Sequence, residues 1–297
     1  MSIIYHYNNL KQKNTTLSDE CVAFMAAALD TWYRIQFSRT RPRLKIHETT
    51  ITQNLVYELT ILKASYSGLK FRLFESVEEK TQGDDLELKI RTSQGQYMTF
   101  AIQSKILYHA SLPNGRNNLK KGNYPKLNHT VEDRSAGLIH NQVDLLLAYA
   151  KSKGYIPLYL LYNYIESGPS IPHFCGIPFN SMQFGCSVVA AEYLKSNFCN
   201  PSTGNLKSNV KFSDLHPSVA LPWSIIPCCF ANYSDSQIFS HLKTPLTQVF
   251  KEAEYIYNPQ KWQPLNADFG KRYEEYVREQ ESRQAIGFDP KFQIVID

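Results

Sequence analysis

Residues 85–107 read DLELKIRTSQGQYMTFAIQSKIL, and this stretch decides the fold class. Polar and apolar residues alternate along 85–91 and again along 96–107, which predicts two amphipathic strands. The Ser-Gln-Gly sequence at 93–95 fits a three-residue hairpin loop that ends on a glycine in the left-handed conformation. The stretch therefore predicts a β-hairpin whose two strands each have one polar and one apolar face.

The centre of this loop sets the register of the hairpin. Equal steps outward place Lys89 opposite Thr99 and Asp85 opposite Gln103. Directly opposed side chains have Cβ atoms about 4.5 to 5.5 Å apart. Lys105 lies two residues beyond Gln103 and shares its face. We therefore expect an acid, an amide and an ammonium group to converge on one patch.

The pattern around the hairpin predicts a mixed sheet covered by helices. A strand that is apolar throughout favours an interior position in such a sheet. The fold class is therefore α/β, with α+β as the alternative, and it is built from these elements: helices at 16–38, 48–63 and 137–153, a strand at 69–77, the two hairpin strands, and an apolar strand at 156–164. A capping box over Thr50–Gln53 is expected to open the second helix.

Punctuation by glycine and proline divides the chain into three parts. We predict an N-terminal helical arm at 1–45, a core at 46–169 and a C-terminal elaboration packed on the core at 170–297. Within the last part the sequence predicts a helix at 186–197, an irregular proline-rich stretch at 214–230 and a charged amphipathic helix at 269–284.

Composition excludes several classes of protein. Of the 297 residues, 43% are hydrophobic and 20% are charged, which is typical of a folded globular chain. The net charge of +5 is too small to make the whole surface basic, so any nucleic-acid contact must depend on local clusters. No apolar run is long enough to span a bilayer, and no secretory signal is visible. We expect a cytoplasmic protein whose six cysteines are reduced.

A fourth polar residue joins the convergent patch. Glu48 lies three, seven and eleven residues before Ile51, Leu55 and Leu59, so it falls on the apolar stripe of its helix. A carboxylate that faces inward near an acid and an amide is explained by a bound divalent cation. An adjacent lysine could then stabilise a nucleophile or developing negative charge.

These residues resemble a known active-site motif. Gly83-Asp84-Asp85, Gln103-Ser-Lys105 and an upstream helical Glu48 resemble the PD-(D/E)xK (restriction endonuclease-like) nuclease superfamily, and within it the Mrr-like branch with a QxK motif. The resemblance covers about residues 46–165 and includes the order of the elements. It implies hydrolysis of phosphodiester bonds with Mg²⁺, or Mn²⁺ in its place. Asp85, Gln103 and Glu48 would be the metal ligands and Lys105 would lie beside the attacking water.

The sequence departs from the commonest form of this motif. No proline precedes the aspartate, glutamine replaces the usual acid, and either Asp84 or Asp85 could align. The hairpin register favours Asp85. Gln142, on the next helix, falls in the region where many relatives of the superfamily place an auxiliary polar residue.

Two basic clusters flank the patch. The upstream cluster comprises Arg39, Arg41, Arg43 and Lys45, and the downstream cluster comprises Arg116, Lys120, Lys121 and Lys126. They would hold phosphates in a nuclease, whereas in other proteins they would be solvated loops. The aromatic residues of the downstream loop, namely Tyr108, His109 and Tyr124, could stack on bases or anchor the loop.

Other interpretations of the same residues remain open. Gln103 and Lys105 could belong to a solvated strand face, and Glu48 could be a carboxylate favoured at a helix N-terminus. A zinc site is disfavoured because the chain has no CxxC pair. Cys186 at a helix start could be a reactive thiolate with His216 or His173 as its base.

The function expected from these observations is metal-dependent cleavage of DNA, in bacterial defence or restriction. One alternative is a catalytically silent nucleic-acid-binding or assembly module with the same fold. Another is a nuclease that acts on RNA or on branched junctions. DNA is the expected partner, formation of a homo-oligomer is left open, and no membrane is expected.

Overall fold

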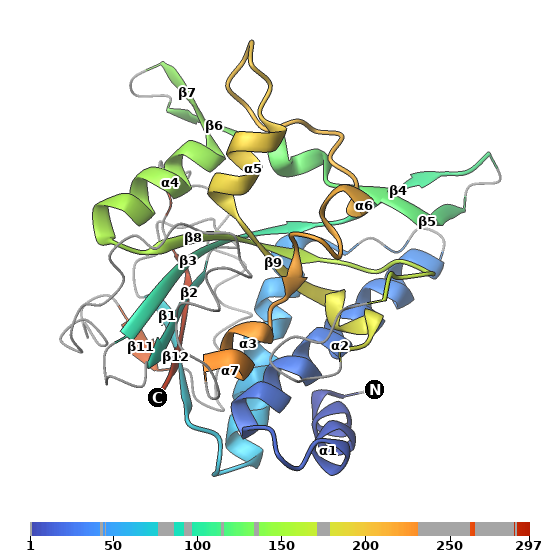
Figure 1. The fold of residues 1–297 in the computed structure, drawn as a ribbon, viewed down its shortest axis with the longest axis vertical. Helices are drawn as coiled ribbons and strands as arrows, with labels where there is room; N and C mark the ends of the chain where they lie inside the picture. Colours follow the sequence, from blue (N-terminus) through green and yellow to red (C-terminus); the bar gives the residue numbers. More distant parts are fainter. Residues whose placement is uncertain are drawn as a thin grey trace.

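One mixed β-sheet organises the chain (Figure 1). The computed structural model describes residues 2–41, 44, 46–76, 86–91, 97–113, 116–133, 137–170, 179–230, 262–264, 288 and 290–297. The strands of the sheet are β1 (Phe71–Ser76), β2 (Leu86–Arg91), β3 (Tyr97–Ile106), β8 (Ile156–Tyr162), β9 (Cys186–Ala190), β10 (Leu221–Pro222), β11 (Trp262–Pro264) and β12 (Phe292–Ile296). They lie in the order β10-β9-β8-β3-β2-β12-β1-β11. The predicted α/β class is confirmed.

Helices cover both faces of this sheet (Figure 1). One face carries α1 (Ile3–Lys13), α2 (Asp19–Thr40), α3 (Glu48–Ser65) and α7 (Ile225–Phe230). The other carries α4 (Gln142–Lys153), α5 (Ala191–Phe198) and α6 (Phe212–Leu215). Two hairpins project from the body, β4 (Tyr108–Ser111) with β5 (Asn117–Asn123) and β6 (Thr130–Asp133) with β7 (Leu138–Asn141). Two 3₁₀ helices, η1 (Pro125–Asn128) and η2 (Ser181–Gly185), complete the described elements.

The predicted pairing of β2 with β3 is confirmed. The two strands are antiparallel with Lys89 opposite Thr99, and the last described pair joins Leu86 to Ile102. The even-numbered residues of both strands are buried on the side of α2 and α3, because alternate side chains point to opposite faces. Strand β8 is interior as expected, since it lies between β3 and β9 and is parallel to β3.

The C-terminal strand completes the centre of the sheet. Strand β12 lies between β1 and β2, parallel to β2 and antiparallel to β1. Strands β9, β10 and β11 also come from residues after 169. The expected three-part division stays a prediction, but both sides of the 169/170 boundary supply strands to this one sheet.

Helix α2 packs at the centre of its layer. Most of its residues are buried, including the small side chains of Ala26, Ala27 and Ala28, which let other elements approach closely. A Cβ atom on Gly185 would lie 2.0 Å from the carbonyl oxygen of Ala28, so only glycine fits where η2 crosses α2.

The expectation that all cysteines are reduced is wrong, since Cys21, Cys228 and Cys229 are each disulfide-bonded. Cys21 of α2 and Cys228 of α7 form a disulfide across a Cα separation of 4.5 Å. The two residues are 207 positions apart in the chain, so only the packing of α7 on α2 brings them together.

Several element boundaries also differ from the sequence-based prediction. Helix α3 starts at Glu48 after the N-cap residue His47, so the expected capping box at Thr50–Gln53 does not open it. Residues 186–190 form strand β9 before α5 begins, and residues 138–141 form β7 before α4. The proline-rich stretch contains α6, β10 and α7, while the helix expected at 269–284 lies outside the described residues.

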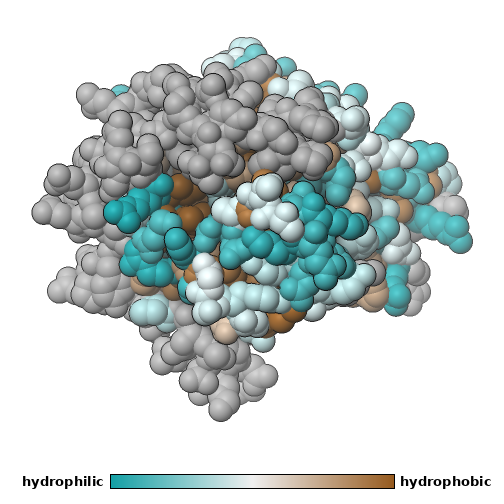
Figure 2. Space-filling view, turned by 60° about the horizontal axis from the view of Figure 1, so that its bottom comes forward, coloured by the Kyte–Doolittle hydropathy of each residue, from teal (hydrophilic) through white to brown (hydrophobic). Residues whose placement is uncertain are grey.

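Hydrophilic side chains dominate the described surface in Figure 2, with hydrophobic ones confined to small areas between them. The exposed large apolar side chains of the described part are Tyr5, Phe37, Leu44, Tyr57, Leu112, Leu138 and Ile139. None of the helices in that part has the length and apolar character that crossing a bilayer requires.

Candidate active site

The candidate site lies at the end of β3. Strand β3 continues to Ile106, four residues past its last described pair with β2, while it stays paired with β8. Gln103 and Lys105 are in this extension, on the face that α4 covers. Glu87 of β2 is paired with Ala101, so its side chain lies on the same face of the sheet as those of Gln103 and Lys105. Because Glu87 accepts a hydrogen bond from Tyr149 of α4, this is the face that α4 covers.

Lys105 is held by Glu48. Its Nζ donates to Oε1 of Glu48 at 3.2 Å, and the backbone N–H of Ile106 donates to Oε2 of the same carboxylate at 3.1 Å. Glu48 is the first residue of α3, and α3 is fixed against β3 by Thr52, whose hydroxyl contacts Ser104 at 3.4 Å. The helix start therefore delivers a carboxylate to the end of the strand.

Burial rules out the interpretation of this face as solvated surface. Gln103 is 2% exposed and Lys105 is 3% exposed. An ammonium group so far from water needs a compensating charge, which Glu48 supplies. The inward orientation predicted for Glu48 is also confirmed, since 11% of its side chain is exposed.

Two amide side chains near this end of the sheet lack partners. Within the described part of the chain, no hydrogen bond reaches the side chain of Gln103. At the start of α4, Oε1 of Gln142 is buried without a hydrogen-bond partner among the described residues. Buried polar atoms of folded proteins are almost always hydrogen-bonded, so unpaired ones in the same region indicate room for a ligand or water.

His129 senses the charges of the site. The pKa of His129 is lowered, first by burial and then by the positive charges of Lys105 and Lys126, while Glu48 acts in the opposite direction. The backbone of His129 accepts a hydrogen bond from the N–H of Gln142 at 3.1 Å. The segment between η1 and β6 therefore borders the same site.

A polar network around Glu87 lies beside the site and was missed in the sequence. Glu87 of β2 accepts hydrogen bonds from Tyr149 at 2.6 Å and from Gln293 of β12 at 3.0 Å. Lys89 lies 3.6 Å from the same carboxylate. The alternation of β2 indicated that Glu87 and Lys89 share a face, but nothing local indicated that β12 and α4 bury it.

The acid expected just before β2, whether Asp84 or Asp85, falls outside the described residues. Asp85 directly precedes Leu86, which pairs with Ile102 next to Gln103. Among the described residues, no group of three or more His, Cys, Asp or Glu side chains could hold a metal ion. The oxygen donors that the structure does bring to this end of the sheet are those of Glu48, Gln103 and Gln142, a set of the type that hard cations such as Mg²⁺ accept.

The described residues of the upstream basic cluster differ in their roles, since one is structural and one is exposed. Arg39 donates to a backbone carbonyl after β3 and packs over the ring at the start of β4, so it is a structural residue. Arg41 is exposed and its guanidinium lies 3.8 Å from the ring centroid of Phe37. Arg43 and Lys45 lie outside the described residues.

The downstream basic cluster is on and beside the β4–β5 hairpin. Arg116, Lys120, Lys121 and Lys126 are all exposed. This hairpin projects from the body in Figure 1. Tyr124, by contrast, is fully buried and its hydroxyl donates to the side chain of Asn163, so it anchors the chain rather than offering a stacking surface.

The proposed cysteine nucleophile does not fit its surroundings. Cys186 is in a strand rather than at a helix start, is fully buried, and burial raises the pKa of its thiol. The neighbouring Ser187 contacts His216 at 2.7 Å and Asn163 at 3.0 Å. This set is also buried and has no described opening, so it is a core polar network. His173 and Cys175 lie outside the described residues.

The comparison with protein families gives one match. Residues 20–293 match a family described as "Family of unknown function (DUF6615)". The chain belongs to this family. The match includes Glu48, Gln103, Lys105 and strand β12, so the candidate site and the strand that completes its sheet fall within the family region. No curated protein and no solved structure matches the chain.

Proposed function

We propose that this chain is a metal-dependent nuclease that hydrolyses phosphodiester bonds in DNA. The observation that carries the proposal is the buried Lys105–Glu48 pair at the end of β3, next to the unpaired amide of Gln103. Burying these charged and polar groups costs folding free energy, and a functional role would explain why the chain keeps them there. The resemblance of Asp85, Gln103 and Lys105 to a QxK nuclease motif supplies that purpose, and it points to defence or restriction as the setting.

Each residue has a role in the proposal. Glu48, Gln103 and Asp85 would hold Mg²⁺ or Mn²⁺, which would polarise the phosphate and activate water. Lys105 would place its positive charge beside the scissile phosphate, where negative charge develops. Glu48 fixes that ammonium before substrate binds, so little reorganisation is needed. The exposed lysines of the β4–β5 hairpin would contact phosphates further along the duplex.

Cleavage of plasmid DNA with Mg²⁺, with Mn²⁺ and with EDTA tests the proposal. We expect cleavage with either metal and none with EDTA. Lys105→Ala and Asp85→Ala should abolish it. Lys89→Met is the matched control, because Lys89 is equally buried on the same face but is paired with Glu87.

The alternatives have distinct results. Binding of DNA without cleavage under any metal condition would leave a catalytically silent binding or assembly module. Faster cleavage of RNA or of a branched junction than of plasmid would change the substrate. Parental cleavage by both Lys105→Ala and Asp85→Ala would remove this site from the chemistry.

A further inference from the structure

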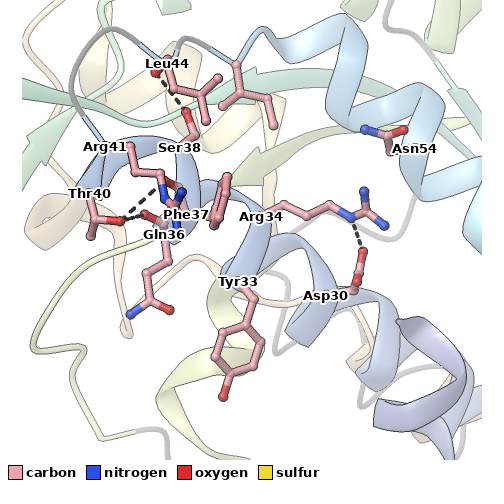
Figure 3. A pocket seen from close by; sticks show the side chains of 11 residues that line it. Asp30, Tyr33, Arg34, Gln36, Phe37, Ser38, Thr40, Arg41, Leu44 and Asn54 are labelled. Atoms are coloured by element: carbon pink, nitrogen blue, oxygen red, sulfur yellow. Dashed lines mark hydrogen bonds and ion pairs between the residues drawn. The ribbon is translucent and has the colours of Figure 1, made fainter. Parts of the chain in front are cut away.

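A pocket of about 630 Å³ lies between the C-terminal half of α2 and the first half of α3 (Figure 3). We call it the α2–α3 pocket. Phe37 lines it from α2, Arg41 from the residue directly after α2, Leu44 and Ile46 from the connecting segment, and Asn54 from α3. The candidate site residues Glu48, Gln103, Lys105 and Gln142 do not line this pocket, so it is a separate feature.

The pocket presents an aromatic surface to solvent. Phe37 is 50% exposed, and large apolar side chains on the surface of a soluble protein are informative when they gather in a cavity. The exposed Leu44 lies in the same pocket. The guanidinium of Arg41 stacks over the ring of Phe37, an arrangement that a planar ligand could replace or extend.

The pocket also carries one guanidinium that is free of ion pairs in the described part of the chain. Arg34 is held by two carboxylates, those of Asp30, which also lines the pocket, and Glu58. Arg41 has no carboxylate partner among the described residues. The side-chain amide of Asn54 likewise makes no hydrogen bond within that part of the chain and can donate or accept. A half-exposed ring, a guanidinium and an amide match two parts of a nucleotide, because the ring suits the flat face of the base, the amide suits its polar edge, and the guanidinium suits the phosphate.

The position of the pocket relates it to the candidate active site. Asn54 is six residues after Glu48 on α3, which corresponds to about 9 Å along the helix axis. Helix α3 therefore links the pocket to the Glu48 end of the site, within reach of one nucleic-acid strand. The basic hairpin is attached to the end of α2, because Asn117 of β5 donates to the backbone carbonyl of Arg39 at 2.9 Å.

We propose that the α2–α3 pocket binds an unpaired nucleotide of the substrate strand, with its base stacked on Phe37 and its phosphate at Arg41. This inference rests on the proposed nuclease function and narrows its substrate to DNA that has a single-stranded segment near the cut. Stacking is tolerant of base identity, so the pocket would select for strand separation rather than for sequence.

Binding in EDTA tests the pocket without cleavage. The probe is a short single-stranded oligonucleotide that carries 2-aminopurine, a base whose fluorescence falls when it stacks. We expect Phe37→Ala to weaken binding by about tenfold, which corresponds to about 1.4 kcal/mol, and to remove the quenching. Arg41→Ala should weaken binding and lower its salt dependence. Tyr5→Ala and Lys13→Ala are the controls, since both are exposed on α1 and neither lines the pocket.

The outcomes separate this inference from the proposed function. Binding that falls no further in Phe37→Ala and Arg41→Ala than in the controls, with parental cleavage of plasmid intact, overturns the pocket and leaves the nuclease. Loss of binding in both variants without any cleavage by the parent supports the pocket and removes the nuclease. If a free nucleoside monophosphate loses affinity in the variants while the oligonucleotide does not, the occupant is a free nucleotide and the assignment to the substrate strand is wrong.

Discussion

Glu48→Gln isolates the charge that holds Lys105 in the protein. Glutamine keeps the length of the side chain and can still accept the hydrogen bond from the N–H of Ile106, so the main loss is the ion pair. Only 4% of the Lys105 side chain is exposed, so water cannot replace the missing carboxylate. Removing one partner of such a pair costs about 3 to 5 kcal/mol of stability, and we expect the lower end of that range.

A double-mutant cycle assigns this loss to the pair. Lys105→Met in the Glu48→Gln background removes the stranded charge and should recover most of the stability. The pair of Asp144 and Lys195 is the matched control: its separation is 2.9 Å, but its side chains are 46% and 29% exposed. An exposed pair contributes about 0.2 to 1 kcal/mol. The free energy of unfolding would be measured for all variants by urea denaturation.

The comparison of the two cycles tests whether Glu48 holds Lys105 away from water. A coupling energy for Glu48 and Lys105 that is no larger than that of Asp144 and Lys195 would show that Lys105 reaches water. It would then have no fixed position at the end of β3, and the reasoning that places its charge beside a phosphate would fail.

Three further predictions use other parts of the chain. Gln103→Glu should preserve or tighten the Mg²⁺ dependence of cleavage, whereas Gln103→Leu should abolish cleavage; equal rates in both would exclude a ligand role. Lys120→Ala with Lys121→Ala should lower the log-log salt slope of DNA binding by about 0.9 for each phosphate that the protein no longer neutralises, and an unchanged slope would make both residues bystanders. Burial lowers the pKa of His216 to about 3, so the unfolded chain takes up the proton first as the pH falls below about 6.5. Stability should therefore fall by about 1.4 kcal/mol per pH unit toward pH 3, and His216→Asn should flatten that slope by one proton.

The hairpin of β2 and β3 could be predicted because its structure depends on local sequence patterns. The alternation of β2 and β3 and the short loop between them indicated the register, which Lys89 and Thr99 confirm. The stripe on α3 indicated that Glu48 faces inward, and its contact with Lys105 confirms that orientation. In each case the physical cause, a strand or helix period, acts within about a dozen residues.

The centre of the sheet could not be predicted in the same way. Strand β12 joins β1 and β2 from the other end of the chain, and the choice of its neighbours depends on long-range packing. Its apolar sequence FQIVI could have indicated a buried strand, but not its place. The Cys21–Cys228 disulfide has the same origin. Cys186 to Ala190 form a strand although their spacing also suits a helix, which shows tertiary pairing with β8 overriding local preference.

The burial of the polar face links the fold to the candidate chemistry. Helix α4 covers the face that carries Glu87, and the carboxylate accepts hydrogen bonds from Tyr149 of α4 and from Gln293 of the neighbouring strand β12. The carboxylate of Glu87 is therefore paired at both oxygens, although Oε1 of Gln293 is buried without a hydrogen-bond partner among the described residues. Gln103 is one strand away on the same face, is equally buried, and has no such partner among the described residues. An unpaired buried amide atom costs about 1 to 3 kcal/mol, and such atoms occur both in the Glu87 network, at Oε1 of Gln293, and at the start of α4, at Oε1 of Gln142. What distinguishes the end of β3 is the buried ion pair of Lys105 with Glu48 beside Gln103, and this charged group is what points to a ligand there.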